Sequence, residues 1–168
     1  MSQLSLFLDS SLLVRDVAGD YRPASADEVL LAAQRVLASQ LRGSEVLNSP
    51  QVVRDFLRVK LGALEHEVFA VIHLDAQHRV IDYVEMFRGT VSQTSVYPRE
   101  VVKEALAKNS AALLLVHNHP SGVAEPSRAD EMLTQTLKTA LALVDVRVLD
   151  HLIVAGNTIM SFAERALL

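Results

Sequence analysis

Apolar residues recur at intervals of three and four positions in several stretches of the chain, which is the spacing of amphipathic helices. The first helix is predicted to begin at Ser25, which can form a capping box with Glu28, and to end at Gly43. Ser49 is predicted to cap the second helix, with Pro50 in its first turn. The predicted helices cover residues 25–42, 49–61, 98–108 and 127–143.

Short runs rich in branched and aromatic residues separate these helices and predict β-strands. Residues 68–74 and 79–87 flank a tight turn and are predicted to pair as an antiparallel hairpin. Residues 111–117 are apolar almost throughout, which is typical of a central strand. Two further strands are predicted at 146–155 and 158–161. The alternation of helices and strands predicts an α/β fold, with three layers (α/β/α) and a mixed sheet.

The N-terminal region lacks this regularity. Residues 1–24 show no clear period and include Gly19 and Pro23, so we expect a loosely ordered arm or a partner contact. The apolar stripe of the helix that follows can pack on the domain or on another subunit, and packing within the chain is the more common case. The sequence does not fix the oligomeric state. The stripe consists of Val29, Leu30, Ala33, Val36, Leu37 and Leu41.

Composition limits the class of protein. Of the 168 residues, 50% are hydrophobic and 21% are charged, which allows a substantial core in one domain. No apolar run approaches the ~20 residues of a membrane span, and the N-terminus has no basic leader, so we expect neither a membrane protein nor a secretory signal. The absence of cysteine excludes thiolate metal ligands and favours a cytoplasmic protein. The formal net charge of -4 does not support electrostatic binding of nucleic acid.

Residues with metal-ligand chemistry gather where the predicted central strand ends. His117 and His119 are two positions apart in an extended segment, so their side chains point to one side and can share an ion. Asp130 follows in the first turn of the next predicted helix. Two nitrogens and a carboxylate suit Zn²⁺, and three protein ligands leave a fourth position for water, as in catalytic sites. The histidine pair alone fits a hydrogen-bonded loop equally well, and Asp130 also suits a helix N-terminus.

Neighbouring residues favour the metal site. His117, Pro120, Ser127 and Asp130 stand in the pattern H-x-H-P…S-x-x-D, which resembles the signature of the JAMM (MPN+) metalloproteins. Longer strings resemble the bacterial RadC family specifically. These strings are Val116–Asp130, Ser95–Leu106 and Val148–Gly156.

The resemblance to RadC proteins carries expectations for most of the chain. It implies a JAMM/MPN architecture, which is cytidine-deaminase-like, over residues 46–168, with residues 1–45 forming an N-terminal arm and helix. It also implies one Zn²⁺ per chain. Longer RadC proteins carry a helix-hairpin-helix region ahead of this domain. Residues 1–45 show no such motif, so we expect the short, stand-alone form that is often found in mobile genetic elements.

Hydrolysis at such a site needs a general base, and JAMM sites use a glutamate from an early strand. The resemblance favours Glu67, directly before the first predicted strand, and leaves Glu85 in the second strand as the alternative. It further implies that Ser127 hydrogen-bonds the developing oxyanion. Additional expectations concern the surroundings of the metal: the rim of the site is assigned to Asn118 and Ser121, and Asp150 or His151 can orient a metal-bound histidine or simply be a buried, satisfied polar residue.

The residues favour one function over three alternatives. The preferred function is a zinc-dependent hydrolase of amide bonds, a metallopeptidase or isopeptidase, with a peptide or protein substrate. The alternative is a DNA-repair or DNA-processing accessory protein, including a metal-dependent nuclease, which the naming of RadC proteins suggests. An inactive scaffold does not fit the intact ligand set. A nucleobase deaminase is excluded because its P-C-x-x-C motif needs cysteines that this chain lacks.

Overall fold

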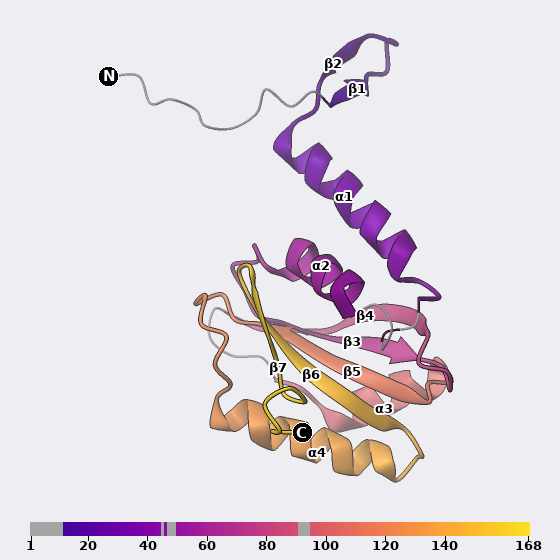
Figure 1. Cartoon of the computed structure of the whole chain (residues 1–168), viewed down its shortest axis with the longest axis vertical. Helices are drawn as coiled ribbons and strands as arrows, with labels where there is room; N and C mark the ends of the chain where they lie inside the picture. The colour runs from indigo at the N-terminus through magenta and orange to yellow at the C-terminus, as the bar shows by residue number, and fades with distance from the viewer. Residues whose placement is uncertain (1–11, 45, 47–49, 91–94) are drawn as a thin grey trace.

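The computed structural model describes residues 12–44, 46, 50–90 and 95–168, and its main feature is a mixed β-sheet (Figure 1). The sheet has five strands in the order β4-β3-β5-β6-β7. β5 and β6 are parallel, whereas β3 is antiparallel to β4 and to β5, and β7 is antiparallel to β6. The predicted strands are confirmed to within one residue at each end. The strands are β3 (Val68–Leu74), β4 (Val80–Arg88), β5 (Ala112–Asn118), β6 (Arg147–Ala155) and β7 (Thr158–Ser161).

Helices cover both faces of the sheet, which confirms the three-layer α/β/α fold (Figure 1). Alternate residues of each strand face opposite layers, so apolar residues are buried on both faces of the sheet. Ala70 and Leu114 belong to the core beneath α2, whereas Val71 and Leu115 belong to the core beneath α3 and α4. The apolar runs of β3 and β5 are explained by this burial on both faces. The helices are α1 (Ala26–Leu41), α2 (Pro50–Leu61), α3 (Pro98–Ala107) and α4 (Arg128–Ala142).

Local capping signals set the starts of two helices. At α1, Ser25 accepts a hydrogen bond from the backbone of Glu28, whose side chain accepts one from the backbone of Ser25. The same reciprocal capping box joins Ser127 and Asp130 at the start of α4. The predicted cap at Ser49 lies outside the described residues.

The N-terminal region differs from the sequence-based expectation in two ways. Residues 12–24 are not a loose arm, because β1 (Leu13–Arg15) and β2 (Tyr21–Pro23) form an antiparallel hairpin. The expectation that the apolar stripe of α1 packs within the domain holds only in part, because Leu30 and Val36 are exposed. Leu41 is buried and Leu37 packs on the core beside α2, but Val36 is 56% exposed.

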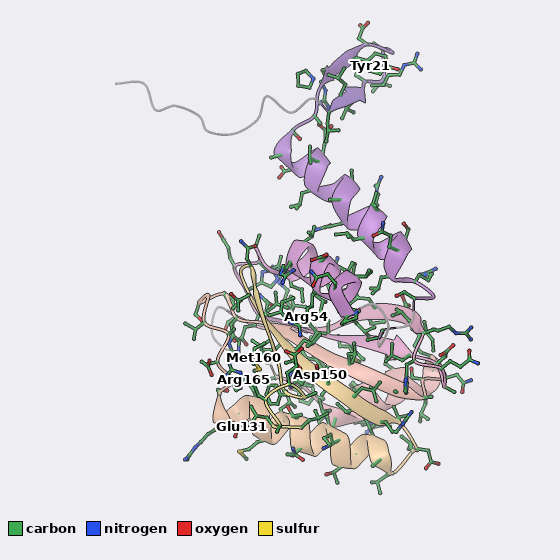
Figure 2. All side chains as sticks on the ribbon, in the orientation of Figure 1. Tyr21, Arg54, Glu131, Asp150, Met160 and Arg165 are labelled. Atoms are coloured by element: carbon green, nitrogen blue, oxygen red, sulfur yellow. The ribbon has the colours of Figure 1, made fainter. Side chains whose placement is uncertain are left out.

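α1 contacts α2 on one face, where Gln34 donates to the backbone carbonyl of Val59 at 3.2 Å. The C-terminal end of α1 lies near α2, and its N-terminal end extends away from the sheet, where the β1–β2 hairpin precedes it (Figure 1). Tyr21 lies in the hairpin at the far end of the molecule and is 69% exposed (Figure 2). Among the helices of the described residues, none combines the length and apolar character needed to cross a bilayer.

Candidate metal centre

Two histidines and an aspartate converge at the edge of the sheet where β5 ends. His117 is the penultimate residue of β5, His119 follows the strand, and Asp130 lies in the first turn of α4. The Nε2 atom of His117 lies 2.9 Å from Nε2 of His119 and 3.2 Å from Oδ1 of Asp130. Nε2 of His119 lies 3.6 Å from Oδ2 of Asp130. The structure therefore brings together the three residues identified as candidate ligands, and they form a group that could bind a metal.

The second nitrogen of each imidazole is engaged by the protein. Nδ1 of His119 donates to the backbone carbonyl of Val123 at 2.8 Å, and Nδ1 of His117 lies 2.8 Å from Nε2 of His151. Both rings therefore present Nε2 to the shared point. Metal-binding histidines in proteins usually show this arrangement, in which the outer ring nitrogen is held by a hydrogen bond.

The electrostatics of the group favour a cation. Burial opposes ionisation of Asp130, but hydrogen bonds from His117 and His119 outweigh it and hold the pKa of this carboxyl far below its usual range. The hydrogen bond to Asp130 raises the pKa of His119, against the opposing effect of burial. The site thus places an ionised carboxylate against two imidazoles in a largely buried setting. Two histidine nitrogens and one carboxylate oxygen are a ligand set that fits Zn²⁺.

The capping box of α4 fixes the aspartate. Oδ2 of Asp130 accepts hydrogen bonds from both the backbone nitrogen and the hydroxyl of Ser127, each at 2.7 Å. The backbone nitrogen of Asp130 in turn donates to the Ser127 hydroxyl oxygen at 3.2 Å. Ser127 therefore lies beside the cluster, as expected from the sequence, but its only hydroxyl proton is directed to Asp130.

Glu67 lies at the same edge of the sheet, directly before β3. Phe69 of β3 is paired with His117 of β5, and this is the last pair of the ladder at the end where Glu67 precedes β3 and His119 follows β5. The negative charge of Glu67 also contributes to raising the pKa of His119. These two observations associate Glu67 with the metal cluster.

The alternative glutamate lies elsewhere. Glu85 of β4 is paired with Ala70, whose side chain belongs to the core beneath α2, on the face opposite to His117. Its carboxylate forms an ion pair with Lys60 of α2 at 3.0 Å. The structure therefore separates Glu85 from the metal cluster by the thickness of the sheet.

Comparison with known proteins identifies the family. The sequence profile of a family described as RadC-like JAB domain matches residues 47–167. The chain belongs to the RadC family. A UPF0758 protein of Leptothrix cholodnii is 64% identical over 150 residues, which cover 89% of this chain and 68% of the relative. A UPF0758 protein of Methylibium petroleiphilum is 58% identical over 167 residues, covering 95% of this chain and 75% of the relative. These names describe no activity, so function must be argued from the site.

Asn118 has a different place in this RadC chain from the one expected. A position at the rim is wrong for this residue, because it is 1% exposed and connects two strands. Its Oδ1 accepts from the backbone nitrogen of Val68 at 2.7 Å, and its Nδ2 donates to the backbone carbonyl of His66 at 3.0 Å. Asn118 thus holds the segment that contains Glu67. Ser121 is exposed, as a rim residue should be.

Of the two candidates for orienting a metal ligand, only His151 contacts one. Asp150 instead accepts hydrogen bonds from Ser161 and from the backbone of Ala163 and His151, so it is a satisfied polar residue, as in the alternative interpretation, although it is only half-buried. Thr134 was not predicted from the sequence, yet its hydroxyl lies 2.6 Å from Nδ1 of His151. The sequence could have indicated Thr134, because it is a polar residue four positions after Asp130 and therefore on the same face of the helix.

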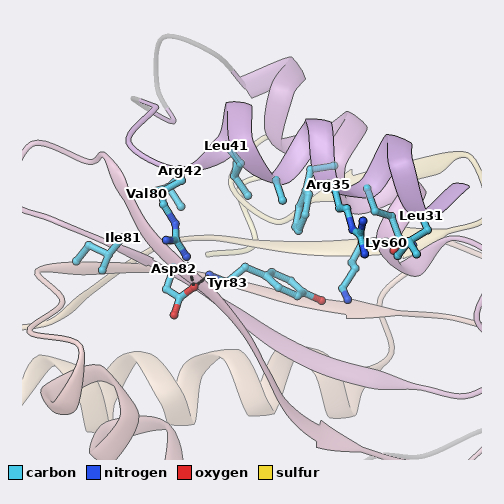
Figure 3. Close-up of a pocket in the computed structure, with 12 residues that line it drawn as sticks. Leu31, Arg35, Leu41, Arg42, Lys60, Val80, Ile81, Asp82 and Tyr83 are labelled. Atoms are coloured by element: carbon cyan, nitrogen blue, oxygen red, sulfur yellow. Dashed lines mark hydrogen bonds and ion pairs between the residues drawn. The ribbon is translucent and has the colours of Figure 1, made fainter. Parts of the chain in front are cut away.

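A pocket in this RadC chain lies away from the cluster, between α1, α2 and β4 (Figure 3). Apolar side chains such as Leu41 and Phe56 line it, and Tyr83 points into it. Lys60 and Arg42 at its margin are already paired, with Glu85 and Asp82 respectively. None of the candidate metal ligands lines this pocket, so it is separate from the metal cluster.

Proposed function

We propose that this RadC-like chain is a zinc-dependent hydrolase of amide bonds, of the metallopeptidase or isopeptidase type, that acts on a peptide or protein. The observation that carries the proposal is the convergence of His117, His119 and Asp130, with the outer nitrogen of each ring engaged elsewhere. One Zn²⁺ per chain would be held by these three residues. When bound, it supplies a Lewis acid and makes water acidic enough to attack a carbonyl at neutral pH.

In this proposal Glu67 is the general base. It accepts a proton from the attacking water and gives it to the leaving amine as the C–N bond breaks. Its support is that Glu67 precedes β3 at the end where Phe69 pairs with His117, and that its charge contributes to raising the pKa of His119. Ser127 is proposed to donate a hydrogen bond to the developing oxyanion. Because its hydroxyl proton is directed to Asp130, this role requires the hydroxyl to rotate away from the carboxylate.

Metal analysis tests the ligand set. We expect protein purified without chelator to contain about one zinc per chain, and His119→Ala to lose it. The control is His78→Asn, at the turn between β3 and β4, because this histidine lies outside the cluster and its positive φ of 59° suits asparagine. A wild-type protein that binds no zinc in zinc-replete buffer would end the metal proposal.

Substrate panels test the reaction. Wild type is incubated with peptide libraries, with isopeptide-linked conjugates, and with single- and double-stranded DNA. Glu67→Gln is expected to reduce peptide or isopeptide cleavage by ~10²-fold or more, the usual contribution of a general base. Glu85→Gln, a matched change on the opposite face, should leave the rate within about threefold. DNA cleavage that disappears in Glu67→Gln would instead support the DNA-processing alternative.

A further inference from the structure

A series of hydrogen bonds connects two of the candidate ligands behind the site. It begins at Asp130, whose backbone carbonyl accepts from the hydroxyl of Thr134 at 2.6 Å. The same hydroxyl oxygen lies 2.6 Å from Nδ1 of His151. Nε2 of His151 lies 2.8 Å from Nδ1 of His117. We propose that Thr134 and His151 are positioning residues that fix the tautomer of His117 and thereby set the affinity for the metal.

Counting protons gives the direction of each bond. A backbone carbonyl can only accept, so the single proton of the Thr134 hydroxyl goes to Asp130. The hydroxyl oxygen is then an acceptor toward His151, and Nδ1 of His151 must carry the proton of that bond. Nδ1 of His151 is therefore the protonated nitrogen of the ring.

The other nitrogen of His151 must then accept. His151 is 0% exposed, and a charged imidazolium with no carboxylate in contact would be costly to bury. The ring is therefore neutral, and its Nε2 is unprotonated and accepts a hydrogen bond. The bond to His117 then takes its proton from Nδ1 of His117, so Nε2 is the nitrogen of this ring that can give up its proton and bind a metal.

The packing around His151 holds its ring in this orientation. Phe162 stacks on it with ring centroids 4.8 Å apart and an interplanar angle of 23°. Phe69 meets it edge to face at 6.0 Å. Aromatic contacts of these two kinds restrict both the tilt and the flip of the imidazole. Without the acceptor at His151, His117 is free to adopt the tautomer whose proton lies on Nε2, which opposes metal binding.

Nuclear magnetic resonance of the metal-free full chain tests the tautomer directly. Long-range ¹H–¹⁵N correlation spectra at pH 7.5 should show a proton on Nδ1 of His117, in the bond to His151. Thr134→Val, which keeps the shape of the side chain and removes the hydroxyl, should give a mixture of the two tautomers. A wild-type His117 without a proton on Nδ1 would overturn the inference, whatever the variants do.

Zinc affinity provides the second readout, measured by competition with a chromophoric chelator, together with the visible spectrum of the Co²⁺ form. We expect Thr134→Val and His151→Phe to weaken zinc binding by about 10- to 100-fold, the usual effect of removing such outer partners. Thr134→Ser restores the hydroxyl and should stay within about threefold of wild type. His73→Phe removes a different buried histidine from the same sheet and should leave the affinity unchanged.

The outcomes separate this inference from the metal proposal on which it rests. If wild type binds zinc, but Thr134→Val and His151→Phe bind it equally well with an unchanged Co²⁺ spectrum, the positioning role is wrong and the metal site stands. If wild type binds no zinc, the metal proposal fails, and the tautomer of His117 still decides whether the hydrogen-bond series works as described. Circular dichroism of each variant establishes that the fold is retained.

Discussion

Replacing Asn118 with alanine should destabilise the protein and displace the proposed base. The Asn118 amide satisfies two backbone groups that belong to the segment before β3, the nitrogen of Val68 and the carbonyl of His66. Val68 is 3% exposed, so its nitrogen would remain buried without a partner, at a cost of about 1–3 kcal/mol. His66 is partly exposed, so water can replace the lost hydrogen bond to its backbone carbonyl, and the cost in stability is about 1 kcal/mol. The expected loss is therefore about 2–4 kcal/mol.

Urea unfolding followed by circular dichroism measures this loss. Asn157→Ala, in the exposed turn between β6 and β7, is the control and should change the free energy of unfolding by less than about 0.5 kcal/mol. At urea concentrations that leave Asn118→Ala folded, zinc content should be retained while cleavage falls, because the segment carrying Glu67 is no longer held. A loss below about 1 kcal/mol together with unchanged cleavage would refute the role assigned to Asn118.

Three further predictions concern stability. Burial lowers the pKa of His73 from 6.5 to about 4. The contribution of neutral His73 to the free energy of unfolding is therefore complete above pH 6.5, and up to about 3 kcal/mol of it is lost as the pH falls toward 4. Urea titrations at several pH values should show that His73→Phe loses less stability in acid than wild type. Ser127→Ala removes the cap of α4 and should lower the free energy of unfolding by about 1 kcal/mol, whereas Ser127→Thr should restore most of it in thermal melts. Leu115→Ala, in the core beneath α3 and α4, should cost about 2–5 kcal/mol in urea, against less than about 0.5 kcal/mol for Leu143→Ala, which is 84% exposed.

Local signals explain what the sequence could predict. β3 and β5 are buried on both faces, so their apolar runs were visible without any knowledge of partners. The boundaries of α1 and α4 follow from capping boxes whose two members are three residues apart. His117, His119 and Asp130 lie within fourteen consecutive residues, so their convergence needed only one strand, one loop and one helix turn.

The features that escaped prediction depend on partners far apart in the chain. Asn118 contacts residues about fifty positions earlier, and no spacing rule connects them. Thr134 meets His151 only because α4 packs along β6. The exposure of Val36 likewise depends on which face of α1 packs against α2, which an apolar stripe does not specify. The hairpin at residues 13–23 has strands of three residues each, too short for a periodic pattern to be recognised.

The direction of β3 decides whether the proposed base and the ligands can meet. β5 delivers His117 and His119 at its carboxyl end, and because β3 is antiparallel to it, Glu67 at the amino end of β3 reaches the same edge. In a parallel arrangement, Glu67 would lie at the far end of the strand, about 20 Å away at about 3.3 Å per residue. No side chain spans that distance. The antiparallel pairing of β3 with β5 thus places Glu67 and the candidate metal ligands at the same edge of the sheet.

This dependence on register can be tested with a single insertion. One alanine inserted between Glu67 and Val68 moves Glu67 outward by one position and turns it to the opposite face of the sheet. Zinc content should remain near one per chain, because His117, His119 and Asp130 are untouched, while cleavage of the peptide or isopeptide substrate should fall to the level of Glu67→Gln. Cleavage at the wild-type rate would show that the carboxylate of Glu67 takes no part in the reaction, and the base would have to be sought among other groups at this edge.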